Sequence, residues 1–238
     1  MTTSDVVFLL DVDNTLLDND RVQDDLKNHL EREFGAASRD RYWAIFEELR
    51  TELGYADYLG ALQRYRYGET SGAMNDPRVL LISSFLVDYP FADRLYPGAL
   101  DVIAQLRAWG RTVILSDGDV VFQPRKIQRS GLWEAVEGRV LIYIHKERTL
   151  NDLEQRYPAR HYVMLDDKLR ILAAMKNVWG LRLTTIFPRQ GHYVLNPHNL
   201  AAYPPADLAI ERIGDLLDCD IPALLRPATV VHGIQEKT

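Results

Sequence analysis

The sequence predicts an α/β protein: a three-layer sandwich on a parallel sheet, with an all-helical subdomain inserted into it. Three observations lead to this prediction. Short apolar runs that are often β-branched, and do not alternate with polar residues, are typical of strands buried on both faces. Helical segments separate most of these runs, which indicates crossover connections between parallel strands. A long stretch after the first run contains only helical patterns.

The core elements follow from local patterns. The apolar runs predict strands over residues 6–10, 112–115, 140–144, 162–165 and 183–187. The amphipathic segments predict helices over residues 97–109, 120–130 and 168–179. Each of these helical patterns is followed directly by a glycine, which is the commonest residue just past the end of a helix.

The inserted subdomain is predicted from four successive helical patterns, over 20–34, 38–53, 57–67 and 77–88. Three of them stop at a glycine and the last stops before Pro90. Because the insert follows the first strand, we expect it to lie as a lid over the carboxyl ends of the strands, where open α/β sheets bind ligands. The predicted division is an α/β core of 1–18 plus 91–238 and a helical cap of 19–90.

Composition restricts the partners. The 238 residues include 34 acidic and 28 basic side chains, and the formal charge of -6 gives no electrostatic reason to expect nucleic acid. The single cysteine, Cys219, excludes an intrachain disulfide and a multi-cysteine zinc site. No stretch reaches the ~20 apolar residues that a membrane span needs. We therefore expect a cytoplasmic monomer or homodimer that binds a small molecule, with no nucleic-acid or membrane partner.

Polar side chains follow four of the predicted strands, each where the strand ends. In chain order they are Asp11 with Asp13, Ser116 with Asp117 and Gly118, Lys146, and Asp166 with Asp167. Taken alone, two carboxylates two residues apart are as readily a solvated turn, and the serine is more often a helix cap. Because the carboxyl ends of parallel strands meet at one edge of a sheet, we expect the four groups to converge on one site.

This arrangement resembles the haloacid dehalogenase-like hydrolase superfamily over nearly the whole chain. The four motifs of that superfamily are matched in order by Asp11-x-Asp13-x-Thr15-Leu16, by Ser116, by Lys146, and by the pair Asp166 and Asp167. Lys126, Arg148 and Lys168 compete for the third position, but Lys146 is favoured because it follows an apolar strand. The resemblance implies a Rossmann-like core with a cap between the first two motifs.

The resemblance also implies a set of catalytic roles. Asp11 is the expected nucleophile, and an aspartyl-phosphate would split hydrolysis into two easier steps. Asp13 is the expected acid/base, which protonates the leaving oxygen and later takes a proton from water. Ser116 would hydrogen-bond a phosphoryl oxygen, while Lys146 would neutralise its charge and position Asp11. The implied function is a Mg2+-dependent phosphoric monoester hydrolase acting on a small phosphorylated metabolite.

A divalent cation is expected from the same carboxylates. Bringing Asp11, Asp166 and Asp167 together is strongly repulsive without a cation, and oxygen ligands favour a hard ion such as Mg2+. By the family pattern, Asp11 and the backbone carbonyl of Asp13 are ligands, with Asp167 the more direct third ligand and Asp166 supporting it. Many relatives carry a further acidic residue one helical turn later, where this chain has Arg170, so the acidic pair must suffice.

Substrate contacts are expected from both the core and the cap. The candidates are Thr15, Asp117 and Gly118 at the strand ends, Arg64 and Tyr67 at the end of a cap helix, and His192 after the fifth strand. Each has an alternative interpretation as a packing or solvated residue. None of them identifies a substrate.

Other functions stay open at this point. A phosphotransferase or sugar-phosphate mutase would use the same nucleophile with another acceptor. A dehalogenase is disfavoured because those relatives generally lack an acid at the position of Asp13, and a phosphonatase because the insert offers only Lys27 as an amine. A receiver-like signalling module would lack the helical insert, and a binding protein without activity would not need the whole set of motifs.

Overall fold

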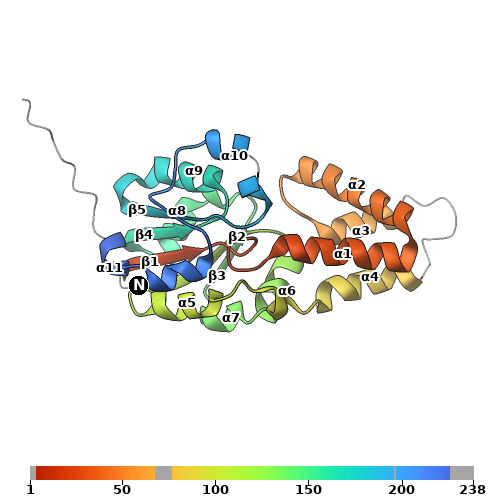
Figure 1. The fold of residues 1–238 in the computed structure, drawn as a ribbon, viewed down its shortest axis with the longest axis horizontal. Helices are drawn as coiled ribbons and strands as arrows, with labels where there is room; N and C mark the ends of the chain where they lie inside the picture. The colour runs from red at the N-terminus through yellow and green to blue at the C-terminus, as the bar shows by residue number, and fades with distance from the viewer. Residues whose placement is uncertain (1–3, 68–76, 196, 226–238) are drawn as a thin grey trace, which may run out of the picture.

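The fold is a parallel sheet covered by helices on both faces, with four further helices grouped beside its carboxyl edge (Figure 1). The computed structural model describes residues 4–67, 77–195 and 197–225. Its strands are β1 (Ser4–Leu10), β2 (Arg111–Asp117), β3 (Val140–Tyr143), β4 (Ala159–Leu165), β5 (Leu183–Pro188) and β6 (Leu208–Ile210). They pair in the order β3-β2-β1-β4-β5-β6, and every neighbouring pair is parallel. The predicted α/β class is confirmed.

Helices cover both faces of this sheet, as predicted. They are α5 (Ala99–Arg107), α6 (Phe122–Arg129), α7 (Leu132–Ala135), α8 (Leu150–Arg156), α9 (Leu169–Trp179), α10 (Pro197–Ala201) and α11 (Ile221–Leu224). Short 3-10 turns complete the connections: η2 (Phe91–Arg94), η3 (Lys146–Arg148), η4 (Gly180–Arg182), η5 (His192–Leu195) and η6 (Ile213–Asp218). Helices α8 and α9 lie on one face and α5 and α7 on the other (Figure 1).

The central strand β1 explains why the strands have continuous apolar sequences. Phe8 and Leu10 belong to the hydrophobic cluster on one face of the sheet, whereas Val7 and Leu9 belong to the cluster on the other. All four side chains are at most 1% exposed. A strand with helices on both sides has no solvent face, so its apolar residues do not alternate with polar ones.

Of the described α-helices between β1 and β2 in the sequence, α5 is the last, and the first four form the predicted all-helical insert: α1 (Asn19–Phe34), α2 (Ala36–Leu53), α3 (Tyr58–Tyr67) and α4 (Pro77–Asp88). Two antiparallel segments connect them to the sheet, where the Asp18 amide donates to Arg94 O (2.8 Å) and the Tyr96 amide donates to Leu16 O (2.9 Å). The insert also packs on the core, since the rings of Tyr58 and Phe122 lie 4.9 Å apart. The exact domain boundaries stay a prediction.

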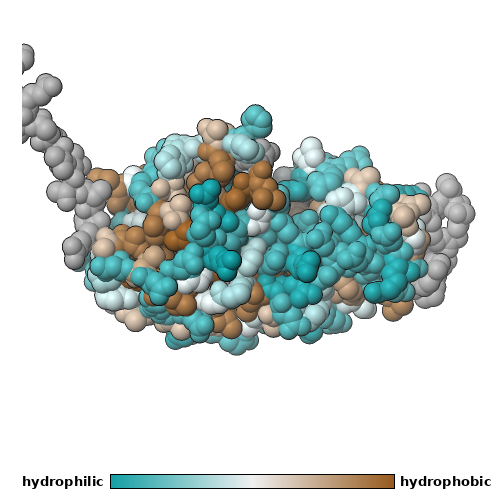
Figure 2. Space-filling view, in the orientation of Figure 1, coloured by the Kyte–Doolittle hydropathy of each residue, from teal (hydrophilic) through white to brown (hydrophobic). Residues whose placement is uncertain are grey.

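The polarity of the surface is consistent with the amphipathic pattern of the insert helices. Figure 2 shows a largely hydrophilic face over α1 and α2, with hydrophobic side chains gathered mainly over the neighbouring sheet-containing part. Among the described helices, none combines the length and the apolar character needed to cross a bilayer.

Candidate active site

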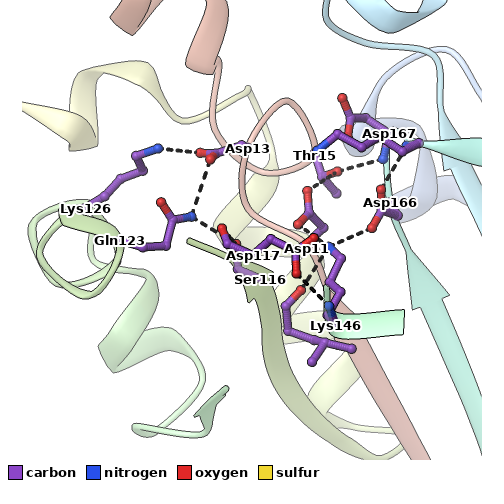
Figure 3. A network of polar contacts seen from close by, with 12 residues as sticks. Asp11, Asp13, Thr15, Ser116, Asp117, Gln123, Lys126, Lys146, Asp166 and Asp167 are labelled. Carbon is purple, nitrogen blue, oxygen red and sulfur yellow. Dashed lines mark hydrogen bonds and ion pairs between the residues drawn. The ribbon is translucent and has the colours of Figure 1, made fainter. Parts of the chain in front are cut away.

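The candidate site lies at the carboxyl end of β1, where the strand order reverses. From β1 the chain reaches β2 and then β3 on one side of the sheet, and it reaches β4, β5 and β6 on the other. Ligands of open α/β sheets bind at such a switch point. The ends of β1, β2 and β4 bring Asp11, Ser116, Asp166 and Asp167 together there (Figure 3).

The first motif is fixed by hydrogen bonds to its neighbours. The Asp11 amide donates to Leu165 O at 3.0 Å, which extends the pairing of β1 with β4. The Thr15 hydroxyl donates to Asp11 Oδ2 at 3.2 Å and accepts from the Asp167 amide at 3.0 Å. Thr15 is completely buried and is not among the residues that line the cavity. Its position is that of a support for two carboxylate-bearing segments, and its contact with a substrate stays a prediction.

Lys146 is the lysine that contacts the proposed nucleophile. Its ammonium pairs with Asp11 Oδ1, lies 2.7 Å from Asp166 Oδ2, and donates to Leu115 O at 3.2 Å. Burial alone would lower the pKa of Lys146, but the charges of Asp11 and Asp166 outweigh it and the pKa is raised. Lys146 is therefore a fixed positive charge beneath the site.

The three buried carboxylates form a cluster that fits a hard cation. Asp11, Asp166 and Asp167 each offer an oxygen within 4.8 Å of the others. Burial raises the pKa of Asp166 to about 6 and raises that of Asp167 well above its usual value. Neither side-chain oxygen of Asp167 has a hydrogen-bond partner among the described residues. Because a buried carboxylate needs compensation, this all-oxygen set is suited to an ion such as Mg2+.

Asp13 lies on the other side of the nucleophile, where its polar contacts lead through Gln123 to Ser116 (Figure 3). Its Oδ1 accepts from the ammonium of Lys126 at 2.6 Å, and its Oδ2 lies 3.4 Å from the amide of Gln123. Lys126 also donates to Asn19 Oδ1 at 2.9 Å, and Gln123 donates to the Ser116 hydroxyl at 2.9 Å. The only sequence signal for this network is the spacing of Gln123 and Lys126, three residues apart on one helix face.

The end of β2 holds the third motif in place. Asp117 Oδ1 accepts from the Lys146 amide at 2.7 Å, and the Gly118 amide donates to Tyr143 O at 3.0 Å. Asp117 lines the cavity, whereas Gly118 is not among its lining residues. The amides of Val121 and Phe122, at the start of α6, donate to Asp119 Oδ1 and not to Ser116.

A cavity of about 260 Å³ opens between the insert and the strand ends. The core contributes Asp13, Asn14, Asp117, Asp167, Lys168, Leu169, Arg170, Phe187, His192, Tyr193, Leu200 and Tyr203, and the insert contributes Asn19, Gln23, Phe46, Arg50, Gly54, Tyr55 and Ala56. His192 is at the rim, where its Nδ1 lies 2.7 Å from Asp20 Oδ1. Burial favours a higher pKa for Asp20, but the hydrogen bonds from His192 and Asn14 outweigh it and the pKa is lowered.

Arg64 and Tyr67, by contrast, are not among the lining residues. The buried face of α3 consists of Tyr58, Ala61, Leu62 and Tyr65. Arg64 therefore points away from that face and pairs with Glu52 at 2.7 Å, and Tyr67 is 66% exposed. Gly68, at which the predicted loop begins, lies outside the described residues. The insert reaches the cavity through the start of α1, through α2 and through the segment after it.

The segment after β5 supports the first motif, and a substitution there has a predictable effect. Gly191 has φ +70°, and a Cβ at this position would lie 2.6 Å from the Cβ of Asn14. We expect Gly191→Ala to reduce the free energy of unfolding by about 3 kcal/mol, because backbone strain adds to a clash with a neighbour that is not a flexible chain end. Urea unfolding measures this change.

Gly180→Ala is the matched control. Gly180 also has a positive φ, +54°, but a Cβ there meets no atom of the described residues within 4 Å. Its expected cost is about 1 kcal/mol, from the backbone alone. Equal losses in the two variants would contradict the contact between Gly191 and Asn14 as the cause. Because Asn14 belongs to the loop that carries Asp11, Gly191→Ala should also lower the turnover rate, whereas Gly180→Ala should not.

Known proteins resemble this chain in sequence and in fold. A model of the haloacid dehalogenase-like hydrolase family matches residues 6–178. A haloacid dehalogenase-like hydrolase from Burkholderia xenovorans LB400 is 68% identical, with 91% of this chain and 99% of that chain covered and a TM-score of 0.85. No match was found among curated proteins.

Two more distant structures share the fold. The HAD-hydrolase YfnB from Bacillus subtilis, bound to magnesium, is 16% identical with a TM-score of 0.62, and the match covers 91% of this chain and 98% of that one. The L-2-haloacid dehalogenase from Xanthobacter autotrophicus is 19% identical with a TM-score of 0.56, and the match covers 90% and 97%. At these identities the similarity is one of fold.

Proposed function

The chain belongs to the haloacid dehalogenase-like hydrolase family, and within this family of hydrolases we propose that it is a Mg2+-dependent phosphoric monoester hydrolase. It would act on a small phosphorylated metabolite through an aspartyl-phosphate on Asp11. A cavity of about 260 Å³ lies just below the usual range for drug-sized ligands, which supports a compact substrate.

The observation that carries the proposal is the second carboxylate, Asp13. Its side chain is 26% exposed and lines the cavity, whereas Asp11 is only 4% exposed and is paired with Lys146. When Asp11 attacks the phosphorus of a phosphate ester, the leaving alkoxide needs a proton. When a halide leaves carbon, it needs none. A second carboxyl at this place supports the phosphatase more than the dehalogenase reaction.

The residues of the chain divide the work as follows. A carboxylate oxygen of Asp11 attacks phosphorus, the bond to the ester oxygen breaks, and Asp13 gives its proton to that oxygen. In the second step Asp13 takes a proton from water as the water attacks the aspartyl-phosphate, which releases phosphate and restores Asp11. Lys146 holds Asp11 in place, and Ser116, oriented by Gln123, can donate a hydrogen bond to a phosphoryl oxygen.

The metal would be held by the buried carboxylates. Asp11 and Asp167 are the proposed direct ligands, together with the backbone carbonyl of Asp13. Asp166 is the proposed support, because its Oδ2 already lies 2.7 Å from Lys146 and its Oδ1 accepts from the Lys168 amide at 2.8 Å. Bound Mg2+ supplies positive charge to the phosphoryl oxygens.

Asp13→Asn tests this assignment through the leaving group. With an alkyl phosphate, whose leaving oxygen needs a proton, the turnover rate should fall by about 10²- to 10⁴-fold. With 4-nitrophenyl phosphate the first step should survive, because nitrophenolate leaves without a proton, while hydrolysis of the aspartyl-phosphate slows. Rapid mixing should therefore show a burst of nitrophenolate, and mass spectrometry should find one phosphoryl group on the protein. Equal losses on both substrates without a burst would contradict the acid/base role.

The competing reactions give different products. Hydrolysis in isotopically labelled water places one labelled oxygen in the released phosphate, whereas a phosphotransferase or mutase moves the phosphoryl group to a second hydroxyl. A dehalogenase releases chloride from 2-chloropropionate. Chloride release without phosphate release in the presence of Mg2+ would overturn the proposal.

A further inference from the structure

One cation in the cavity has no role in the chemistry described above. Lys168 follows the carboxylate pair directly, lines the cavity, and is half-buried. Its ammonium makes no hydrogen bond or ion pair with the described part of the chain, and its described contact is with the ring of Tyr193, 5.2 Å from Nζ to the centroid. Lys146 and Lys126, in contrast, each donate directly to a carboxylate.

The neighbouring acids do not neutralise the charge of Lys168 through a direct ion pair. Asp11 accepts hydrogen bonds from Thr15 and Lys146 instead, and neither oxygen of Asp167 accepts one from the described residues. Asp11 and Asp167 are the proposed ligands of a divalent cation, which compensates them. A half-buried ammonium beside compensated acids is suited to bind an anion from the cavity.

A second cation reaches the same tyrosine from the opposite wall. Arg50, near the end of α2, donates from Nη2 to the Tyr193 hydroxyl at 2.8 Å. Its nearest carboxylate, Glu47, is 3.6 Å from Nη1 and half exposed, so that ion pair is weak. The guanidinium has five N–H donors, and the bond to Tyr193 uses one of them. Tyr193 thus lies between an arginine of the insert and a lysine of the core.

The third cation of the cavity differs from these two. Arg170 donates from Nη1 to Glu147 Oε1 at 2.7 Å, and this carboxylate is only 6% exposed. The charge of Arg170 is therefore compensated inside the protein. Positive charge that is free to meet a ligand is concentrated on the two sides of Tyr193.

From this geometry we infer that Lys168 and Arg50, on either side of Tyr193, bind a second anionic group of the substrate, separate from the phosphoryl group that reacts at Asp11. The substrate class is then a compact phosphate monoester that also carries a carboxylate or a second phosphate. This inference rests on the proposed function, because the reacting end of the cavity is the one lined by Asp13 and Asp167, which the proposed function places beside the nucleophile.

Binding of non-reacting phosphonates to the Mg2+-loaded protein tests the inference by calorimetry. Propylphosphonate carries the phosphoryl-like end alone, 3-phosphonopropionate adds a carboxylate, and propane-1,3-bisphosphonate adds a second phosphonate. We expect at least one of the two ligands that carry a second anionic group to bind about tenfold or more tightly than propylphosphonate, because charge-assisted hydrogen bonds to a half-buried site are strong. Whichever binds more tightly identifies the second group as carboxylate or phosphate.

The variants separate the two ends of the ligand. Lys168→Met and Arg50→Met should each remove most of the advantage and leave the affinity for propylphosphonate within about twofold. Lys168→Arg, which retains a charged hydrogen-bond donor, should keep a larger part of the advantage than Lys168→Met. Arg107→Met is the control. Arg107 is paired with Glu137 and is the last residue of α5, which leads into β2 at the edge of the sheet opposite the site. It should change neither affinity. Should Lys168→Met fail to fold, Arg50→Met still tests the same advantage.

The outcomes distinguish this inference from the proposed function. Equal affinities of all three ligands in the unsubstituted protein would overturn the second anion site and leave the phosphatase proposal standing. An equal loss for all three ligands in Lys168→Met would also overturn it, because the ammonium would then bind the phosphoryl end. If no phosphonate binds in the presence of Mg2+, both are overturned.

Discussion

Asp11→Asn is expected to lower phosphate release by about 10⁴-fold or more, while the protein stays folded. The amide cannot form the aspartyl-phosphate, and removing the nucleophile removes the covalent route as a whole. The fold should persist because asparagine has the same shape and because Lys146 keeps Asp166 as a partner at 2.7 Å. One of three clustered carboxylates is also lost, which relieves repulsion in the metal-free protein.

Phosphate release from 4-nitrophenyl phosphate with Mg2+ measures the effect, and thermal unfolding checks the fold. Asp5→Asn is the matched control: Asp5 is on the same strand, at its other end, and is 83% exposed in its pair with Arg160. Its activity should equal that of the unsubstituted protein. Activity of Asp11→Asn within tenfold of that level would show that the nucleophile is another residue.

The core fold could be predicted because its signals are local. Burial on both faces makes the strands continuous apolar runs, and the five predicted strands are all present. The sixth, Leu208–Ile210, has three residues, and α8, Leu150–Arg156, has seven. Neither is long enough to show a period, so both were missed. The strand is defined by the sheet edge along which it pairs, and the helix by the sheet face on which it packs.

The candidate site likewise has a part that the sequence predicts and a part that it does not. Asp11, Ser116, Lys146, Asp166 and Asp167 could be predicted to converge because the carboxyl ends of parallel strands meet.

The cap side of the cavity could not be predicted in this way. Which face of a helix turns inward depends on the helices that pack on it. The sequence pattern favours Arg64, whereas Arg50 is the arginine of the insert that lines the cavity in the structure. The partnership of Lys126 with Asp13 joins residues that are distant in the sequence, and nothing local marks it.

The second large effect concerns the stability of the metal-free protein as a function of pH. The pKa of Asp166 is raised by burial from 3.8 to about 6. Between these two pH values the folded state therefore holds more protons than the unfolded state, and the free energy of unfolding falls as the pH rises. Above pH 6 neither state holds this proton, and the full cost, on the order of 3 kcal/mol, is present. The raised pKa of Asp167 acts in the same direction.

Other carboxylates have the opposite effect, so the contribution of Asp166 has to be taken as a difference. The pKa values of Asp20 and Asp207 are lowered, and such groups add stability as the pH rises. We expect metal-free Asp166→Asn to be more stable than the unsubstituted protein at pH 7.5 and to lose that advantage by pH 4. Urea unfolding in EDTA at both pH values measures the difference, and parallel curves would contradict the raised pKa of Asp166.

Magnesium should oppose this pH dependence. A cation that binds the carboxylates only in the folded state stabilises it by mass action, and it must displace the protons that Asp166 and Asp167 hold at low pH. The stabilisation by Mg2+ should therefore be large at pH 7.5 and small at pH 5. Asp167→Asn should lose most of it, because both oxygens of Asp167 are free of hydrogen bonds from the described residues. If Asp167→Asn keeps the Mg2+ effect and Asp166→Asn loses it, the proposed roles of the two acids are reversed.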